Sequence, residues 1–582
     1  MKRAAGPALA ACATALAAGC GRAPPGPLPS GGATVRFPAT WPYPAGGAPV
    51  TSRGAMVVST DSLASAAGLE ILAAGGNAVD AAVAVQFALA VANPEAGNIG
   101  GGGFLVARFA DGESVALDFR ETAPARATPD MFLNARGEPT DASWTGHLAA
   151  GVPGSVAGLS EAHRRFGRLP WADVLAPAVA LARDGFPVGE RLAASIGASR
   201  TRLAESAASA AIFLPGGRPP TVGSPFRQPD LARTLGAVAD SGAAAFYRGW
   251  VADSLEAEMR RGGGLVTRAD LAAYRAVWRQ PLRFEYRGHR IIGMPPPSSG
   301  GVTLAEILNI LEGFDIAGLG FHSADAIHLE VEAMRRAFED RNRWLGDPDF
   351  VDVPVARLVS DEHADSLRGT IDPRRASTSS RGPTASEATQ TTHFSIVDAE
   401  GNAVAVTTTL NGSYGSAVVV RGAGFLLNNE MDDFTTRPGH PNAYGLIQGE
   451  ANAIRPGKRM LSSMAPTIVV SPDGRTELVT GTPGGPAIIT TVFQVVSALI
   501  DHRLPVRDAV DAPRFHHQGL PDVVRYEKGG LPPEVVRELR RRGHRVEERP
   551  GFSGDVQSVG IGPDGLRSGA SDRRRGGRAL GG

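Results

Sequence analysis

Two β-prone runs carry the strongest indication of chemistry in this sequence. Residues 391–398 (TTHFSIVD) and 402–410 (NAVAVTTTL) are joined by Ala399-Glu400-Gly401. A three-residue hairpin loop that ends in glycine is a recognised connection, because glycine tolerates the left-handed conformation required there. In that register Thr391 lies directly opposite Thr409, and opposed residues in a sheet have Cβ atoms about 4.5–5.5 Å apart. We therefore predict that the two threonine hydroxyls lie within hydrogen-bonding reach.

The segment before Thr391 indicates what that hydroxyl can do. Residues 365–390 consist mostly of Ser, Thr, Arg, Gly and Pro, a composition typical of an exposed and mobile linker. Cleavage between Gln390 and Thr391 would give the threonine a free α-amine with a pKa of about 7.7–8.0, and such an amine can activate a threonine nucleophile. The alternative is that these threonines are ordinary strand residues, since threonine is common in sheets.

Local patterns indicate the elements that must position this hairpin. Alanine-rich and leucine-rich stretches favour helices, and a helix that is apolar all round is usually buried. The expected elements are a helix over 61–75, a buried helix over 79–91 capped by Asn77, a strand over 104–109 after the glycine run 100–103, a sharp loop over 294–301 and a helix over 304–311.

The N-terminus is typical of an export signal. Within residues 1–20, two basic residues precede an apolar run that is too short for a comfortable membrane span. Cys20 follows three small residues, as in a bacterial lipoprotein signal, and is a candidate for lipidation, although Ala17 stands where leucine is usual. The alternative is cleavage nearby without lipidation. We expect an exported protein, periplasmic or secreted, which contacts a membrane only through a lipid at Cys20.

Both ends of the mature chain have compositions that favour irregular structure. Residues 21–53 are rich in proline and glycine, which predicts an extended linker with order beginning near Gly54. The Arg/Gly-rich residues 573–582 are expected to be disordered.

Composition excludes several classes of function. Of 582 residues, 43% are hydrophobic and 20% are charged, so the chain has ample material for buried cores. That length alone suggests about four domains. Basic and acidic residues number 59 each, which gives no global attraction to nucleic acid or to anionic membranes. Both cysteines lie within the first twenty residues, so the rest of the chain has no thiol nucleophile, disulfide or cysteine zinc site.

A series of longer motifs resembles the gamma-glutamyltransferase (gamma-glutamyltranspeptidase) family over about residues 54–572. The matching motifs, in order, are GGGGF at 100–104, DFRE at 118–121, PPPSSGG at 295–301, TTH at 391–393, LNNEMDDF at 427–434, LSSM at 461–464, PGG at 483–485 and PRFHH at 513–517. The resemblance implies the four-layer αββα sandwich of N-terminal-nucleophile hydrolases, an α/β fold. It also implies a precursor that cleaves itself into a large subunit (54–390, ending in a flexible linker from about 365) and a small subunit (391–582), which stay associated as a heterodimer.

The resemblance also implies roles for individual residues. Thr391 resembles the nucleophile, its released amine the base, and Thr409 the residue that orients the Thr391 hydroxyl. The substrate that donates a gamma-glutamyl group has an α-carboxylate and an α-ammonium. Its α-carboxylate is expected at Arg120, Ser462 and Ser463, since guanidinium binds carboxylate through two parallel hydrogen bonds. Its α-ammonium is expected at Asn411, Glu430 and Asp433, with Glu430 standing where many bacterial relatives carry glutamine. Gly484 and Gly485 resemble an oxyanion hole made of two backbone N–H groups.

The implied reaction moves the gamma-glutamyl group of glutathione or a related donor to water, an amino acid or a peptide. Residues 436–448, with Tyr444, resemble the loop that covers the donor pocket, which favours glutamyl transfer. Two alternatives remain: a glutaryl-type β-lactam (cephalosporin) acylase with the same machinery, and a non-catalytic binding homologue. We expect no cofactor. We also expect no metal at His516-His517, because adjacent strand residues point to opposite faces, and the glycine run 100–103 lacks the Lys-Ser/Thr of a phosphate loop.

Overall fold

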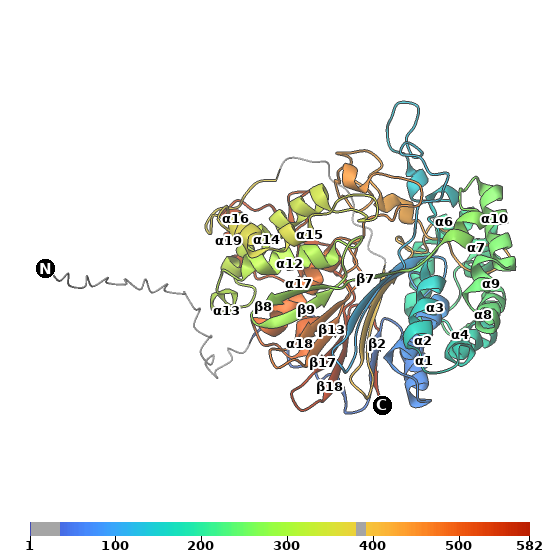
Figure 1. Ribbon diagram of the computed structural model, residues 1–582, viewed down its shortest axis with the longest axis horizontal. Helices are drawn as coiled ribbons and strands as arrows, with labels where there is room; N and C mark the ends of the chain where they lie inside the picture. The colour runs from blue at the N-terminus through green and yellow to red at the C-terminus, as the bar shows by residue number, and fades with distance from the viewer. Residues whose placement is uncertain (2–34, 380–390) are drawn as a thin grey trace. The chain divides into compact units, whose positions relative to one another are not determined.

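Two antiparallel sheets are stacked between two layers of helices in this computed structural model (Figure 1). The structure describes Met1, residues 35–379 and residues 391–582. The expected export signal, Cys20 and Gln390 lie outside the described residues. Residues 35–582 form one unit rather than the four domains that length alone suggests.

The first sheet contains the predicted hairpin. In spatial order its strands are β19 (Arg578–Gly581), β2 (Met56–Ser59), β10 (Thr392–Val397), β11 (Ala403–Thr409), β3 (Gly102–Arg108), β4 (Ser114–Asp118) and β7 (Val277–Arg279). The second sheet runs β1 (Val50–Ser52), β18 (Arg567–Ser571), β17 (Gln557–Ile561), β13 (Thr476–Thr480), β12 (Thr467–Val470), β9 (His289–Gly293) and β8 (Leu282–Tyr286). Smaller sheets pair β5 (Phe186–Pro187) with β6 (Pro225–Phe226), and β14 (Phe515–His516) with β15 (Val524–Glu527) and β16 (Val546–Arg549).

Each sheet has its own helical layer, one on either side of the stack (Figure 1). The layer beside the first sheet contains α1 (Ser62–Ala73), α2 (Ala78–Ala92), α3 (Ser155–Phe166), α4 (Trp171–Asp184), α6 (Arg200–Glu205), α7 (Ala207–Phe213), α8 (Pro229–Ser241), α9 (Ala243–Tyr247) and α10 (Trp250–Gly262). The layer beside the second contains α12 (Gly300–Leu311), α13 (Ile316–Leu319), α14 (Ala324–Trp344), α15 (Val355–Leu358), α16 (Asp361–Arg368), α17 (Ala487–Ile500), α18 (Val506–Asp511) and α19 (Pro533–Arg541). Two further short helices are α5 (Glu190–Ala198) and α11 (Arg268–Ala273).

Both faces of the hairpin strands are buried. Phe394 and Ile396 of β10 join the core beneath α1 and α2, while Ala403 and Ala405 of β11 join the core between the two sheets. Successive strand residues point to opposite faces, so a strand buried on both sides has no exposed face for charged side chains. This position explains why the hairpin sequence is so poor in charged residues.

The local predictions for the first two helices are confirmed. Asn77 accepts hydrogen bonds from the backbone N–H groups of Val79 and Asp80, and the Asp80 side chain accepts one from Asn77 N, which makes a capping box. Every residue of α2 is buried, as its lack of a polar face predicts.

The expectation that order begins near Gly54 is wrong. Trp41 is buried and its indole N–H donates to the backbone oxygen of Asp511 (2.8 Å), and β1 pairs with β18. One large aromatic residue provides enough buried area to anchor a proline-rich stretch, and composition alone does not reveal that.

The expected disorder of residues 573–582 is also wrong, because β19 pairs with β2. Arg574 is fully buried between Glu527, 2.8 Å away, and Asp572, 3.1 Å away. Paired charges of this kind can be buried, although an arginine-rich composition suggests exposure.

The segment expected to be a linker is partly structured. Its first residues, 365–368, belong to α16, and the backbone N–H groups of Ser377 and Ser379 donate to the carboxylates of Glu332 and Asp522. An irregular linker therefore begins, at the earliest, after Arg368. Among the described residues, none of the helices combines the length and hydrophobicity that crossing a membrane requires.

Glu330, buried on α14, makes the stability of the fold depend on pH. Burial, with a contribution from Asp501, raises the pKa of Glu330 to about 8. Between the two pKa values the folded state keeps a proton on Glu330 that the unfolded chain has already lost. The stability that Glu330 contributes is therefore present at low pH and is lost as the pH rises through about 8. We expect the Glu330→Gln variant to lose less stability than the wild type between about pH 5 and pH 8, by up to about 1.4 kcal/mol per pH unit.

The measurement is the apparent melting temperature at several pH values and a fixed heating rate. Glu362→Gln, which changes an exposed residue of α16, is the matched control and should follow the wild type. Identical slopes for the wild type and Glu330→Gln would show that Glu330 is not protonated in the folded protein.

Candidate active site

Thr391 and Thr409 face each other at the open end of the hairpin. The strand register pairs Thr392 with Thr408, which is the predicted register. The Thr391 hydroxyl donates to Thr409 Oγ1 at 3.3 Å, and both residues are buried. Thr409 Oγ1 also accepts a hydrogen bond from the backbone N–H of Asn411 (2.8 Å). The hydroxyl of Thr409 is thus fixed in place beside that of Thr391.

The histidine of the TTH motif, His393, is neutral and contacts neighbouring side chains of the hairpin. His393 Nδ1 lies 2.8 Å from Thr407 Oγ1, and its Nε2 lies 3.1 Å from Ser395 Oγ. Burial lowers the pKa of His393 to about 3, so the imidazole is neutral at physiological pH. Gly481 packs so closely on this ring that an added Cβ would lie 2.3 Å from it.

The loop Pro483-Gly484-Gly485 follows Gly481 shortly after and leads into α17. Its φ angles are +143° at Gly484 and +56° at Gly485, and the second of these lies in the left-handed region that favours glycine. Within residues 35–379 and 391–582, neither of these two backbone N–H groups donates a hydrogen bond. A pair of unengaged amides at the start of a helix can stabilise a developing negative charge on oxygen.

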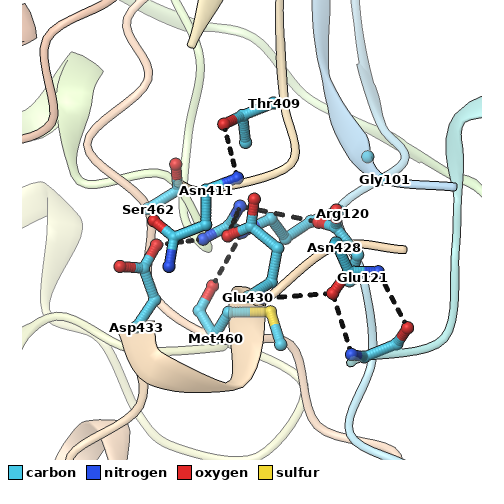
Figure 2. Close-up of polar contacts among 12 residues, drawn as sticks. Gly101, Arg120, Glu121, Thr409, Asn411, Asn428, Glu430, Asp433, Met460 and Ser462 are labelled. Carbon is cyan, nitrogen blue, oxygen red and sulfur yellow. Dashed lines mark hydrogen bonds and ion pairs between the residues drawn. The ribbon is translucent and has the colours of Figure 1, made fainter. Parts of the chain in front are cut away.

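Arg120 lies among three carboxylate groups (Figure 2). Its guanidinium contacts Glu430 at 2.5 Å and Glu121 at 3.5 Å, and it also forms an ion pair with Asp433. A further N–H donates to the backbone oxygen of Met460 (3.4 Å). The side chain is 1% exposed. The LNNEMDDF and DFRE motifs therefore meet at one buried cluster.

This cluster has more acidic groups than basic ones. Burial alone would lower the pKa of Arg120, but the carboxylates of Glu430, Asp433 and Glu121 more than offset it and raise that pKa. Burial raises the pKa of Glu430 and of Asp433, and it raises the pKa of Glu121 to about 8. Three carboxyl groups around one guanidinium leave acidic capacity for an additional cation, such as an ammonium group.

Tyr444 connects the loop 436–448 to the hairpin. Its hydroxyl lies 2.6 Å from Asn411 Oδ1 and 2.9 Å from the Asn411 backbone oxygen, and the residue is 5% exposed. The Asn411 side chain in turn donates to the backbone oxygen of Asn429 (2.9 Å). Asn411, two residues after Thr409, is therefore fixed from both sides, and its partner Asn429 directly precedes Glu430.

Ser462 and Ser463 lie beside a cation that sequence reasoning missed. Ser463 Oγ accepts a hydrogen bond from Arg341 (3.1 Å), whose guanidinium also donates to Ser299 Oγ (3.0 Å). The backbone oxygen of Ser462 accepts from Ser299 N at 2.7 Å. Burial lowers the pKa of Arg341 to about 10, and none of the described residues forms an ion pair with it. Arg341 lies on α14, outside every motif, so no sequence pattern indicated it.

The paired histidines contact separate partners. His516 Nδ1 lies 2.8 Å from Thr490 Oγ1, whereas His517 Nε2 lies 3.1 Å from Asp522. Burial lowers the pKa of His517 to about 4. The two side chains thus contact different groups, although β14 ends at His516 and His517 lies just beyond it.

Comparison with known proteins places the whole arrangement in one family. The family model for gamma-glutamyltranspeptidase matches residues 64–582. The glutathione hydrolase proenzyme of Escherichia coli (strain K12) is 50% identical over 532 residues, which cover 90% of this chain and 91% of that protein. Among solved structures, the cephalosporin acylase of Bacillus halodurans superposes with a TM-score of 0.83 at 31% identity, over 94% of this chain and 99% of that one.

A second solved structure, the gamma-glutamyltranspeptidase of Helicobacter pylori, has 45% identity and a TM-score of 0.54, over 54% of this chain and 91% of that one. The stacked sheets and helical layers are the αββα sandwich that the motifs predicted. The chain belongs to the gamma-glutamyltranspeptidase family.

Proposed function

We propose that this protein is a self-processing gamma-glutamyltransferase and glutathione hydrolase with Thr391 as its nucleophile. The observation that carries the proposal is the hydroxyl pair of Thr391 and Thr409, placed where the strand begins. The family relationship and the proenzyme relative support the same reaction.

Processing and turnover use the same hydroxyl. In the precursor, Thr391 Oγ attacks the carbonyl carbon of Gln390, the peptide bond breaks, and water releases the large subunit from the resulting ester. The freed α-amine of Thr391 is then the base that takes the proton from its own hydroxyl. In turnover, Thr391 Oγ attacks the gamma-carbonyl of the donor and an acyl-enzyme forms. Water or the amine of an acceptor releases the glutamyl group.

The two glycine amides stabilise the tetrahedral intermediates of both steps. Gly484 and Gly485 present N–H groups without side chains, so a carbonyl oxygen can approach them closely. Thr409 keeps the Thr391 hydroxyl aligned for the attack and is itself held by Asn411 N.

The donor is a zwitterion at its α-carbon, and the Arg120 cluster has groups for both charges. Its α-carboxylate binds Arg120 together with the hydroxyls of Ser462 and Ser463, and Arg341 adds positive charge behind Ser463. Its α-ammonium binds Asn411, Glu430 and Asp433, of which the two acids contact the Arg120 guanidinium. The resemblance assigns to Tyr444, which bonds Asn411, the role of covering this pocket. A donor carboxylate must share Arg120 with the carboxylates that already contact it.

One prediction of this mechanism concerns processing. We expect purified protein to separate on a denaturing gel into two chains, because the Thr391 hydroxyl is the proposed nucleophile of self-cleavage and has Thr409 as its partner. N-terminal sequencing of the smaller chain should give Thr-Thr-His-Phe. An active enzyme that remains one uncut chain would disprove this mechanism.

A second prediction concerns Arg120. The Arg120→Lys variant keeps the charge but cannot make two parallel hydrogen bonds to a carboxylate. We expect donor binding to weaken by about 1.5–3 kcal/mol, the range for a hydrogen bond to a charged group. The measurement is KM for a gamma-glutamyl anilide. Self-cleavage is the internal control and should be spared, since it needs no donor. Unchanged KM would mean that Arg120 is only structural.

The acylase alternative is supported by the structural likeness to the cephalosporin acylase of Bacillus halodurans. The loop 436–448 favours the glutamyl reaction, because it resembles a loop that covers the donor pocket and its Tyr444 bonds Asn411. A covered pocket suits a small acyl group rather than a bulky one. Parallel assays of glutathione, a gamma-glutamyl anilide and a glutaryl-cephalosporin distinguish the two. Faster turnover of the cephalosporin would favour the acylase.

The proposal of export, with Cys20 either lipidated or lost by cleavage nearby, rests on the N-terminal sequence alone. The mature enzyme is a heterodimer that is periplasmic or secreted, with amino acids or peptides as acceptors. Cys20 is the lipidation candidate. Mass spectrometry of the mature N-terminus distinguishes a lipid-modified Cys20 from an unmodified end, and radiolabelled palmitate should label the wild type but not Cys20→Ala.

A further inference from the structure

Three helices bring two carboxylates and one imidazole together on the side of the molecule away from the first sheet. Glu306 comes from α12, Asp340 from α14 and His363 from α16, which lie close together in that helical layer (Figure 1). One ligand atom from each residue lies within 4.8 Å of the other two. His363 Nε2 is 2.7 Å from Asp340 Oδ2 and 3.6 Å from Glu306 Oε1. None of these residues belongs to the proposed active site.

Glu306 is the unusual member of the group. It is 1% exposed, and within the described part of the chain neither of its carboxylate oxygens forms a hydrogen bond. A buried carboxylate without such partners is costly unless a proton or another cation neutralises it. His363 Nε2 lies 3.6 Å from Glu306 Oε1, beyond hydrogen-bond distance, and bonds Asp340 Oδ2 instead. The one ion-pair partner that the described residues offer Glu306 therefore does not satisfy its carboxylate.

We propose that Glu306, Asp340 and His363 bind a divalent first-row metal ion such as Zn²⁺ or Mn²⁺. Imidazole nitrogen suits first-row transition ions, and carboxylate oxygen is shared by Zn²⁺ and Mn²⁺. Three protein ligands leave a coordination position for water. Asp340 and His363 are 15% and 16% exposed, which gives the ion a path from solvent, while Glu306 forms the buried side of the site.

A second cluster of similar composition lacks these properties. His328, Glu332 and His544 also lie close together, but His328 Nδ1 and His544 Nε2 already bond each other at 2.8 Å. Glu332 forms ion pairs with Arg335 (3.4 Å) and Arg336 (2.7 Å). Its charge is therefore already balanced, and two guanidinium groups would repel a metal ion. This cluster is a useful control rather than a second site.

The site joins elements that are distant in sequence. Helix α16 is the last regular element before the segment 380–390 and the proposed cleavage point. A metal ion held by α12, α14 and α16 would fix that helix to the helical layer. We therefore expect metal binding to raise the apparent melting temperature, and we expect the proposed transfer chemistry not to require it.

The test is isothermal titration calorimetry of tag-free, processed protein that has been treated with EDTA and dialysed. ZnCl₂ and MnCl₂ are titrated separately. We expect one ion per chain for the wild type, and a loss of affinity of at least about 10-fold in Glu306→Gln and in His363→Gln. Two control variants should bind like the wild type: His289→Gln, which removes a similarly half-buried histidine paired with Glu477 at 3.1 Å, and His544→Gln, in the second cluster.

The position of the ion provides a readout that does not depend on variants. Anomalous diffraction from Zn²⁺-soaked crystals of the wild type should place the ion between Glu306, Asp340 and His363. No binding by the wild type would overturn the proposal and would mean that Glu306 and Asp340 share a proton instead. Loss of binding in His544→Gln but not in Glu306→Gln, or an ion located elsewhere, would also overturn it.

Discussion

Thr391→Ala is expected to remain a single chain and to show no measurable transfer or hydrolysis of a gamma-glutamyl anilide. The substitution removes the oxygen that attacks both the Gln390 carbonyl and the donor carbonyl. The Thr391 side chain is buried, and among the described residues its hydroxyl bonds only that of Thr409, so little of the fold depends on it. Denaturing gels and steady-state assays of the same preparation measure both losses together.

Two further substitutions make this result specific. Thr391→Ser keeps an Oγ, so cleavage should continue, more slowly. Thr392→Val is the matched control, because the Thr392 hydroxyl is buried and forms no hydrogen bond within the described residues. It should process and turn over like the wild type. Residual turnover by Thr391→Ala, confirmed free of contaminating enzyme, would assign the nucleophile to another residue.

Thr409→Ala is expected to process slowly and to turn over about 10²-fold or more below the wild type, the lower end of what misplacing a reacting group costs. The Thr391 hydroxyl keeps its chemistry but loses the partner that lies 3.3 Å away. The readouts are the half-time of self-cleavage in freshly purified precursor and kcat for the anilide.

Thr409→Ser restores the hydroxyl and should recover most of both rates, which a merely structural effect of the lost methyl group would not allow. The backbone N–H of Asn411 loses its acceptor only in the alanine variant. If Thr409→Ala processes and turns over like the wild type, the orienting role of Thr409 is wrong.

The hairpin and its register were predictable because they depend on local rules. A glycine at the end of a three-residue loop fixes which residues face each other, and Gly401 has a φ of +94° as that loop requires. Helix α2 was predictable for the same reason, since its cap and its apolar composition are both local. The four-layer fold and the site residues other than Thr391 and Thr409 came from resemblance rather than from pattern.

What escaped prediction depends on contacts between distant segments. Arg341 reaches Ser463 from a helix more than a hundred residues earlier in the chain, and no motif marks it. The ion pair between Arg120 and Glu430 was not predicted, because the resemblance assigned Arg120 to the substrate's carboxylate and Glu430 to its ammonium group. Trp41 and Arg574 were misjudged because composition does not reveal that a tryptophan or a paired arginine will be buried.

The strand order has a consequence for the lifetime of the processed enzyme. After cleavage at Thr391, β10 and β11 belong to one polypeptide, yet they lie between β2 and β3 of the other. In the second sheet, β18, β17, β13 and β12 are likewise flanked by β1 and β9. The strands of the two polypeptides are therefore interleaved, and the polypeptides cannot separate without breaking the hydrogen bonds between strands of a sheet. The lifetime of the heterodimer is thus set by the activation barrier to unfolding rather than by a dissociation constant. Dilution should therefore not release the two polypeptides, and heat inactivation should be irreversible.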